Sequence, residues 1–214
     1  MRFILGLFAA VVIFTVQPVL AETYTERKER EALEAEAKLK KLNTVLMTVQ
    51  DAYQAIPHQQ TPFNKKRSKI PAKESKYLDH FFFVSDMALR ARVMTLNYFW
   101  DRKRSMSIEE YNAEIDNFLS SFEFAKAPTE ALVEAERLLI ESIKEQQEFF
   151  NAWEKARGTD KFELYSKNMA NHPKVKSSHG KLLQTYYILK AAYPREDEQN
   201  LQAFYDHLCA LDFI

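Results

Sequence analysis

Two arginines in the aromatic stretch HFFFVSDMALRARVM, residues 80–94, could bind an anion. Each residue advances by about 100° around a helix, so Asp86, Arg90 and Asn97 fall on one narrow polar stripe. Arg92 lies on an apolar side instead, where an unpaired charge is costly. A planar guanidinium suits a carboxylate or a phosphate. These four residues therefore predict a pocket for a small anionic ligand, bound by Arg90 and Arg92.

A structural role would explain the same residues. Asp86 and Arg90 stand four residues apart and could pair across one turn of a stripe that faces water. Arg92 could form an ion pair with a neighbouring helix. The remaining positions make this helix apolar around most of its circumference, which is typical of a helix packed by neighbours on most sides. The sequence thus predicts that 73–104 is the central helix of a bundle.

The histidines show no spacing that is typical of a metal site. No Glu-x-x-His or His-x-x-x-His pair places two ligands on one helix face. His172 and His179 flank a predicted break and could meet in a weak metal site. Covalent haem attachment is excluded because there is no Cys-x-x-Cys-His motif, but Met87 or Met94 could face a histidine, His80 or His207, around a non-covalent haem. Core packing is the commoner role of such methionines, and we expect no metal and no cofactor.

A Glu-Ser pair carries a resemblance to one enzyme family. Glu141 precedes Ser142, and the sequence GKLLQ follows at 180–184. These elements resemble the Glu-Ser and Gly-x-x-Gln elements of the soluble lytic transglycosylases, which are secreted and helical. The glycine element is one residue longer here and comes later in the chain than in that family. The resemblance implies a peptidoglycan-active hydrolase that depends on Glu141; otherwise this glutamate is a solvated helix residue.

The composition predicts one folded domain without a nucleic-acid partner. Among 214 residues, 30 basic and 30 acidic side chains cancel to a formal net charge of zero. Sixteen phenylalanines and ten tyrosines supply a core. Cys209 is the only cysteine, so an intramolecular disulfide cannot form. We expect it to be buried as a small apolar residue, with a disulfide-linked dimer as the alternative.

The first 21 residues have the pattern of a secretory signal peptide. Arg2 precedes an apolar run that ends before Pro18, and Val19 and Ala21 are small enough for signal peptidase. The run is shorter than the roughly 20 residues that span a membrane, so we expect cleavage rather than an uncleaved anchor. The mature chain, 22–214, would then be periplasmic or secreted, without a membrane span.

The scarcity of glycine and the positions of the prolines predict an all-α, single-domain bundle of about six or seven helices. Only three glycines occur, and Asn-Gly and Asp-Gly turns are absent. Ser107 and Glu110 form a capping box at the start of one helix. The segment 171–180 reads as a break. The predicted helices span 25–55, 73–104, 107–125, 128–158, 160–171, 181–192 and 196–211.

These features favour a non-catalytic binding or accessory protein of the bacterial envelope, which acts through helix surfaces on a protein partner. The long charged helix 25–55 is the best candidate contact, and the basic loop 65–69 is the second. The alternative is a sensor or carrier of a small anion that uses Arg90 and Arg92. A peptidoglycan-active hydrolase is the third possibility.

Overall fold

The computed structural model describes residues 61–212, and within them the chain is entirely helical apart from its connections. The predicted all-α bundle is confirmed. The predicted signal peptide and the predicted helix 25–55 lie outside the described residues, so the domain boundary at residue 21 stays a prediction. The elements are α3 (Ala72–Phe99), α4 (Ile108–Ser120), η1 (Ser121–Phe124), α5 (Glu130–Lys155), α6 (Phe162–Lys167), η2 (Met169–Asn171), α7 (Pro173–Ala192) and α8 (Glu198–Ala210).

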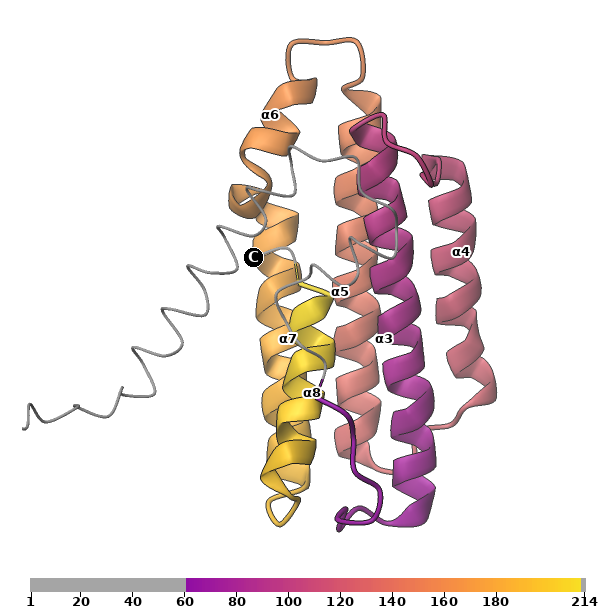
Figure 1. The fold of residues 1–214 in the computed structure, drawn as a ribbon, viewed down its shortest axis with the longest axis vertical. Coiled ribbons are helices and arrows are strands. Elements are labelled where there is room, and N and C mark those ends of the chain that lie inside the picture. The colour runs from indigo at the N-terminus through magenta and orange to yellow at the C-terminus, as the bar shows by residue number, and fades with distance from the viewer. Residues whose placement is uncertain (1–60, 213–214) are drawn as a thin grey trace, which may run out of the picture.

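The long helices run up and down along one axis (Figure 1). Helices α3, α4, α5 and α7 alternate in direction, and α8 then returns beside α7 and α3. Helix α3 contacts α4, α5 and α8, whereas α5 contacts α3, α4, α6 and α7. The predicted central helix therefore shares the centre of the bundle with α5. The short helices α6 and η2 lie at one end, within the connection from α5 to α7 (Figure 1).

Helix α3 is apolar around most of its surface, as predicted, but one phenylalanine faces outward. Phe81 and Leu89 are buried and Phe82 nearly so, while the neighbouring Phe83 is 53% exposed. Trp100, at the end of the helix, is 36% exposed. Three consecutive residues cover about 200° of a helix, so a neighbour that covers two of them can leave the third in solvent.

Helix α3 ends earlier than predicted. The predicted limit was residue 104, but the helix ends at Phe99 because Asp101 and Arg104 have positive φ angles of 50° and 56°. A side chain rarely adopts this left-handed conformation inside a helix. The buried Asn97 supports the turn, since its backbone carbonyl accepts from the Arg102 N–H at 2.8 Å.

The predicted break at 171–180 is wrong, because this segment forms the first half of α7. His172 is the N-cap and Pro173 occupies the first helical position, where its missing N–H costs nothing. Val175 and Ser178 are buried, and α7 packs along α5. Tertiary packing thus outweighs the low helix propensity of this stretch. The predicted helix 160–171, in contrast, divides into α6 and η2.

Caps and aromatic packing account for the remaining architecture. The predicted capping box is confirmed: Ser107 accepts from the Glu110 N–H, and the Glu110 carboxylate accepts from the Ser107 N–H. In the core, the rings of Phe99 and Trp153 stack with centroids 4.1 Å apart. Phe150 lies 5.8 Å from Phe99. These rings pack α3 against α5 close to α6, so α6 lies on closely packed aromatic side chains.

Candidate functional site

Arg92, the residue predicted to bind an anion, instead binds the end of α8. Its side chain is 6% exposed, and its two terminal nitrogens donate to the carbonyl oxygens of Leu211 at 2.5 Å and Ala210 at 2.9 Å. The last carbonyls of a helix lack partners within the helix, and a cation there is favourable. Burial lowers the pKa of Arg92 to about 10, while Asp212 opposes that change. The guanidinium therefore stays charged at neutral pH.

The other three predicted ligand residues lie in separate surroundings. Asp86 binds the His207 ring, with 2.8 Å between Oδ1 and Nδ1, rather than Arg90. Arg90 is exposed on α3. Asn97 is buried under the loop after α3 and donates to the Arg104 carbonyl at 3.4 Å. Among residues 61–212, the four side chains thus have different surroundings. Anion binding by this set stays a prediction without geometric support.

A buried polar cluster completes the surroundings of the α8 end. The Gln146 side chain donates to the Leu211 carbonyl at 2.9 Å and to the Ser178 hydroxyl at 3.1 Å. Ser142 lies 2.8 Å from the same hydroxyl, and all three side chains are at most 1% exposed. Helices α3, α5 and α7 each contribute a group to this cluster. Ser142, Gln146 and Ser178 hydrogen-bond to one another and to the Leu211 carbonyl, which is typical of a structural network.

The basic loop predicted at 65–69 belongs to a longer segment that is fastened to α8; we call residues 61–70 the basic strap. The Thr61 N–H donates to Asp206 at 3.0 Å and the Asn64 N–H donates to Asn200 at 2.7 Å. Further along, the Lys69 N–H donates to Glu196 at 2.7 Å. The three acceptor side chains are 7% exposed or less. Buried side chains thus hold the strap by its backbone.

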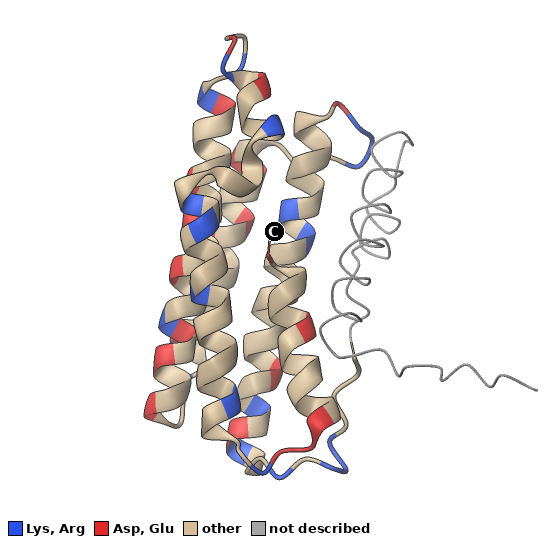
Figure 2. Ribbon diagram, turned by 90° about the vertical axis from the view of Figure 1, so that its left-hand side faces the viewer, with Lys and Arg blue, Asp and Glu red and all other residues tan. Residues whose placement is uncertain are grey.

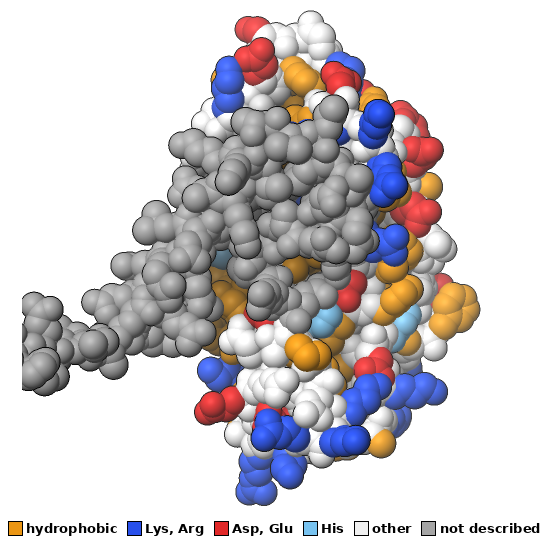
Figure 3. Space-filling model, viewed as in Figure 1, with side chains coloured by type: hydrophobic (Ala, Val, Ile, Leu, Met, Phe, Trp, Pro, Cys, Tyr) orange, Lys and Arg blue, Asp and Glu red, His pale blue; other side chains and the backbone are white. Residues whose placement is uncertain are grey.

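The cationic side chains of the basic strap point into solvent. Lys65, Lys66, Arg67 and Lys69 are all exposed, and the strap is anchored by Phe63, whose ring stacks on Phe204 at 5.7 Å. Lys65 pairs with Asp79 at 2.6 Å and Arg67 with Asp197 at 3.7 Å. Among the described residues, Lys66 and Lys69 have no carboxylate within ion-pair distance. Lys and Arg side chains gather at the lower end of Figure 3, where the strap and the start of α3 lie.

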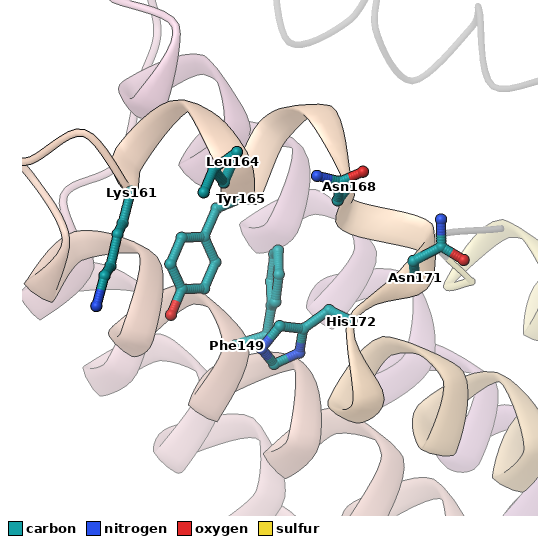
Figure 4. A pocket seen from close by; sticks show the side chains of 7 residues that line it. All are labelled: Phe149, Lys161, Leu164, Tyr165, Asn168, Asn171 and His172. Carbon is teal, nitrogen blue, oxygen red and sulfur yellow. The ribbon is translucent and has the colours of Figure 1, made fainter.

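A second candidate site is a cavity of about 310 Å³ between α6, η2 and the helices beneath them. Phe149 of α5 forms its floor, and α6 and η2 form an arch over it (Figure 4). The sequence did not single out this site, because its residues are spread over three elements. They are Phe149, Lys161, Leu164, Tyr165, Asn168, Asn171 and His172.

His172 has a defined orientation in this cavity. Its Nδ1 accepts from the Lys174 N–H at 3.3 Å, and its ring packs edge-on against Phe149 at 4.9 Å and beside Tyr165 at 5.7 Å. Burial and the nearby Lys174 lower the pKa of His172. With Nδ1 serving as an acceptor, the neutral ring carries its proton on Nε2. His172 is therefore a hydrogen-bond donor at neutral pH.

Glu141 lies on an ordinary charged helix face. It pairs with Arg137 on the same helix and lies 3.9 Å from the Lys181 ammonium of α7. Lys181 also binds Glu145 at 2.8 Å. Charged residues of both signs alternate along such outer faces (Figure 2). Glu141 does not line the cavity under α6, so the hydrolase hypothesis gains no support from its position.

The two histidines considered for a weak metal site, His172 and His179, have separate partners. His172 caps α7, while His179, on the same helix, binds Asp212. His80 lies 3.2 Å from the Ser121 hydroxyl. Within residues 61–212, no three side chains of the metal-binding types gather closely enough to hold an ion.

The helices of residues 61–212 do not include one with the length and apolar character needed to cross a membrane. Cys209 of α8 is only partly buried, and the disulfide-linked dimer stays a prediction.

Comparisons with known proteins assign no class to this fold and these sites. No protein-family model, no curated protein and no solved structure matches the chain. The two candidate sites therefore rest on their own geometry.

Proposed function

We propose that the protein is an exported, non-catalytic accessory protein of the bacterial envelope that binds an acidic surface of a protein partner through its basic strap. The observation that carries this proposal is that the backbone of the strap is bound to the protein while its cationic side chains are exposed. Its backbone is bound by Asp206, Asn200 and Glu196, while its cationic side chains are left in solvent. All three acceptors are buried; Asn200 and Asp206 lie on α8 and Glu196 lies in the turn before it, so they fix the course of the strap at three points.

A preorganised loop favours binding because less conformational entropy is lost on association. The side chains of Lys66, Lys69 and Lys73 are exposed and lie close together in sequence, and the described residues offer them no carboxylate within ion-pair distance. Cations arranged this way accelerate encounter with an acidic partner and discriminate against basic ones. The charged helix predicted at 25–55 remains a second candidate contact.

Matched charge reversals test the proposal. The triple variant Lys66→Glu, Lys69→Glu, Lys73→Glu changes the strap and the start of α3. A control variant, which carries the same change of charge at exposed lysines elsewhere, combines Lys103→Glu, Lys144→Glu and Lys176→Glu. Tagged protein of each kind is cross-linked in envelope extracts, and the affinity of any recovered partner is then measured with purified components at several salt concentrations.

We expect the same partner from the wild-type and control proteins. The strap variant should bind at least about tenfold more weakly, and the wild-type affinity should fall with salt. Circular dichroism melts establish that all three proteins are folded. Equal affinity of the strap and control variants would remove the strap as the contact.

The exported state has its own test. A chain with a cleaved signal peptide begins at Glu22 and is recovered from the periplasm or the medium. N-terminal sequencing of the protein expressed with its first 21 residues measures this directly. A chain that retains Met1 in the membrane fraction would establish an anchor instead.

A further inference from the structure

The cavity under α6 combines apolar walls with a rim of hydrogen-bond donors. Phe149, Leu164 and the rings of Tyr165 and His172 form its walls. Leu164, one of the lining residues, is 53% exposed. A volume of about 310 Å³ is at the lower end of cavities that hold small organic ligands. The walls therefore suit a compact, flat, apolar body.

The rim carries positive charge and no negative charge. Lys161, the N-cap residue of α6, and Tyr165 within α6 extend in the same direction (Figure 4). None of the seven lining residues is an acid. Among residues 61–212, the Lys161 ammonium has no carboxylate within ion-pair distance.

Amide and imidazole groups extend the set of donors. Asn168 and Asn171 lie on the opposite side of the cavity from Lys161 (Figure 4). His172 offers an Nε2–H because its Nδ1 is occupied by the N-cap bond to the Lys174 N–H. A ligand with oxygen acceptors can bind these groups, although the side-chain oxygens of Asn168, Asn171 and Tyr165 are neutral acceptors as well. Because the seven lining residues include a lysine and no acid, the rim favours an anion over a cation.

We propose that this cavity binds a small aromatic carboxylate, with the ring against Phe149, Tyr165 and His172 and the carboxylate at Lys161. The site is separate from the basic strap and does not depend on the function proposed for it. A planar acid fits both halves of the lining: its ring takes the place of water on the apolar walls, and its carboxylate pairs with the ammonium.

Titration with a matched pair of probes tests the proposal. The purified exported chain, labelled with ¹⁵N, is titrated with 2-naphthoate and, separately, with the neutral 2-naphthalenemethanol. We expect saturable shifts that are confined to the amides of 161–172 and their neighbours on α5, and a lower Kd for the acid. No saturable shift with either probe, or shifts spread over all helices, would overturn the proposal.

Two variants locate the site. Leu164→Trp fills the cavity and should abolish naphthoate binding, whereas Val133→Trp, at a residue with similar exposure on α5, should leave it unchanged. Lys161→Glu should weaken naphthoate about five- to tenfold and leave the neutral probe unaffected. Lys144→Glu is its control. Equal binding by all four variants would place the ligand elsewhere and refute the assignment.

Folding of the variants can be measured separately. Leu164 and Lys161 are both exposed, so thermal melts of their variants should match the wild type. A Leu164→Trp protein that melts normally and still binds naphthoate with the wild-type Kd would exclude this cavity.

Discussion

The end of α8 and the rim of the cavity under α6 both carry polar side chains in an aromatic bundle, and they differ in whether these side chains have partners within the protein. At the α8 end, Arg92 and Gln146 are buried and donate to backbone carbonyls. In the cavity, Lys161 and Asn168 are exposed, and nothing in the described part of the chain binds their side chains. Buried, mutually satisfied groups stabilise the fold, whereas groups that lack such partners can bind something else.

The largest loss of stability is expected from a substitution of Arg92. In Arg92→Met the aliphatic stem keeps its packing, but the Ala210 carbonyl loses its donor and Asp212 loses a nearby cation. We expect a loss of about 3–5 kcal/mol in the free energy of unfolding, measured by urea denaturation. A loss below about 1 kcal/mol would mean that the α8 end is held mainly by other contacts.

The next largest effect is expected at the buried acceptors of the basic strap. Asn200 is fully buried, accepts from the Asn64 N–H and donates to the Asn64 carbonyl at 3.2 Å. Asn200→Ala leaves both backbone groups without these partners and should cost about 2 kcal/mol. Trypsin should also cleave the strap faster, because its local opening becomes easier.

The control for this variant is Asn117→Ala at an exposed position of α4. It should change neither the unfolding free energy nor the trypsin rate measurably. If Asn200→Ala destabilises the protein but leaves the rate of cleavage within the strap unchanged, the hydrogen bonds of Asn200 do not hold the strap against α8.

A smaller effect concerns the pH dependence of α7. Because the pKa of His172 is lowered in the folded chain, the unfolded chain binds more protons below the ordinary pKa of about 6.5. The contribution of the neutral ring is complete above that pH and is lost as the pH falls through the folded-state pKa. Protonation of Nδ1 also removes the N-cap acceptor for the Lys174 N–H, which costs about 1 kcal/mol.

His172→Asn isolates this contribution. Asparagine can accept the same N–H at the N-cap but does not titrate. We expect its free energy of unfolding to fall less than that of the wild type between about pH 7.5 and about pH 5. The two proteins differ only at residue 172, so the difference between their pH profiles reports on His172. Parallel pH profiles would show that its protonation does not affect stability.

The smallest effect should come from the rim of the cavity. Lys161→Met makes the same kind of change as Arg92→Met, a cation replaced by methionine, but at an exposed site. We expect a change within about 0.5 kcal/mol in the free energy of unfolding. A loss above about 1 kcal/mol would give Lys161 a structural role and erase the contrast between the two regions.

Most of the fold could be predicted from local signals, and the candidate sites could not. Glycine scarcity, proline positions and the Ser107 capping box predicted the helices and their order. The predicted break before Gly180 failed because burial of Val175 against α5 is a tertiary effect. The early end of α3 depends on the backbone at Asp101 and Arg104, and no sequence pattern there signals left-handed residues.

The sequence by itself determined that Arg92 had to lie on an apolar side of its helix and needed a partner, because helical spacing and the cost of a buried charge are local facts. Only the tertiary structure decided that the partners are the carbonyls of Ala210 and Leu211, which lie more than a hundred residues away in the chain. It also decided that Lys161 and His172 share a cavity. Spatial proximity between distant residues follows from how the helices pack, and helix periodicity does not encode it.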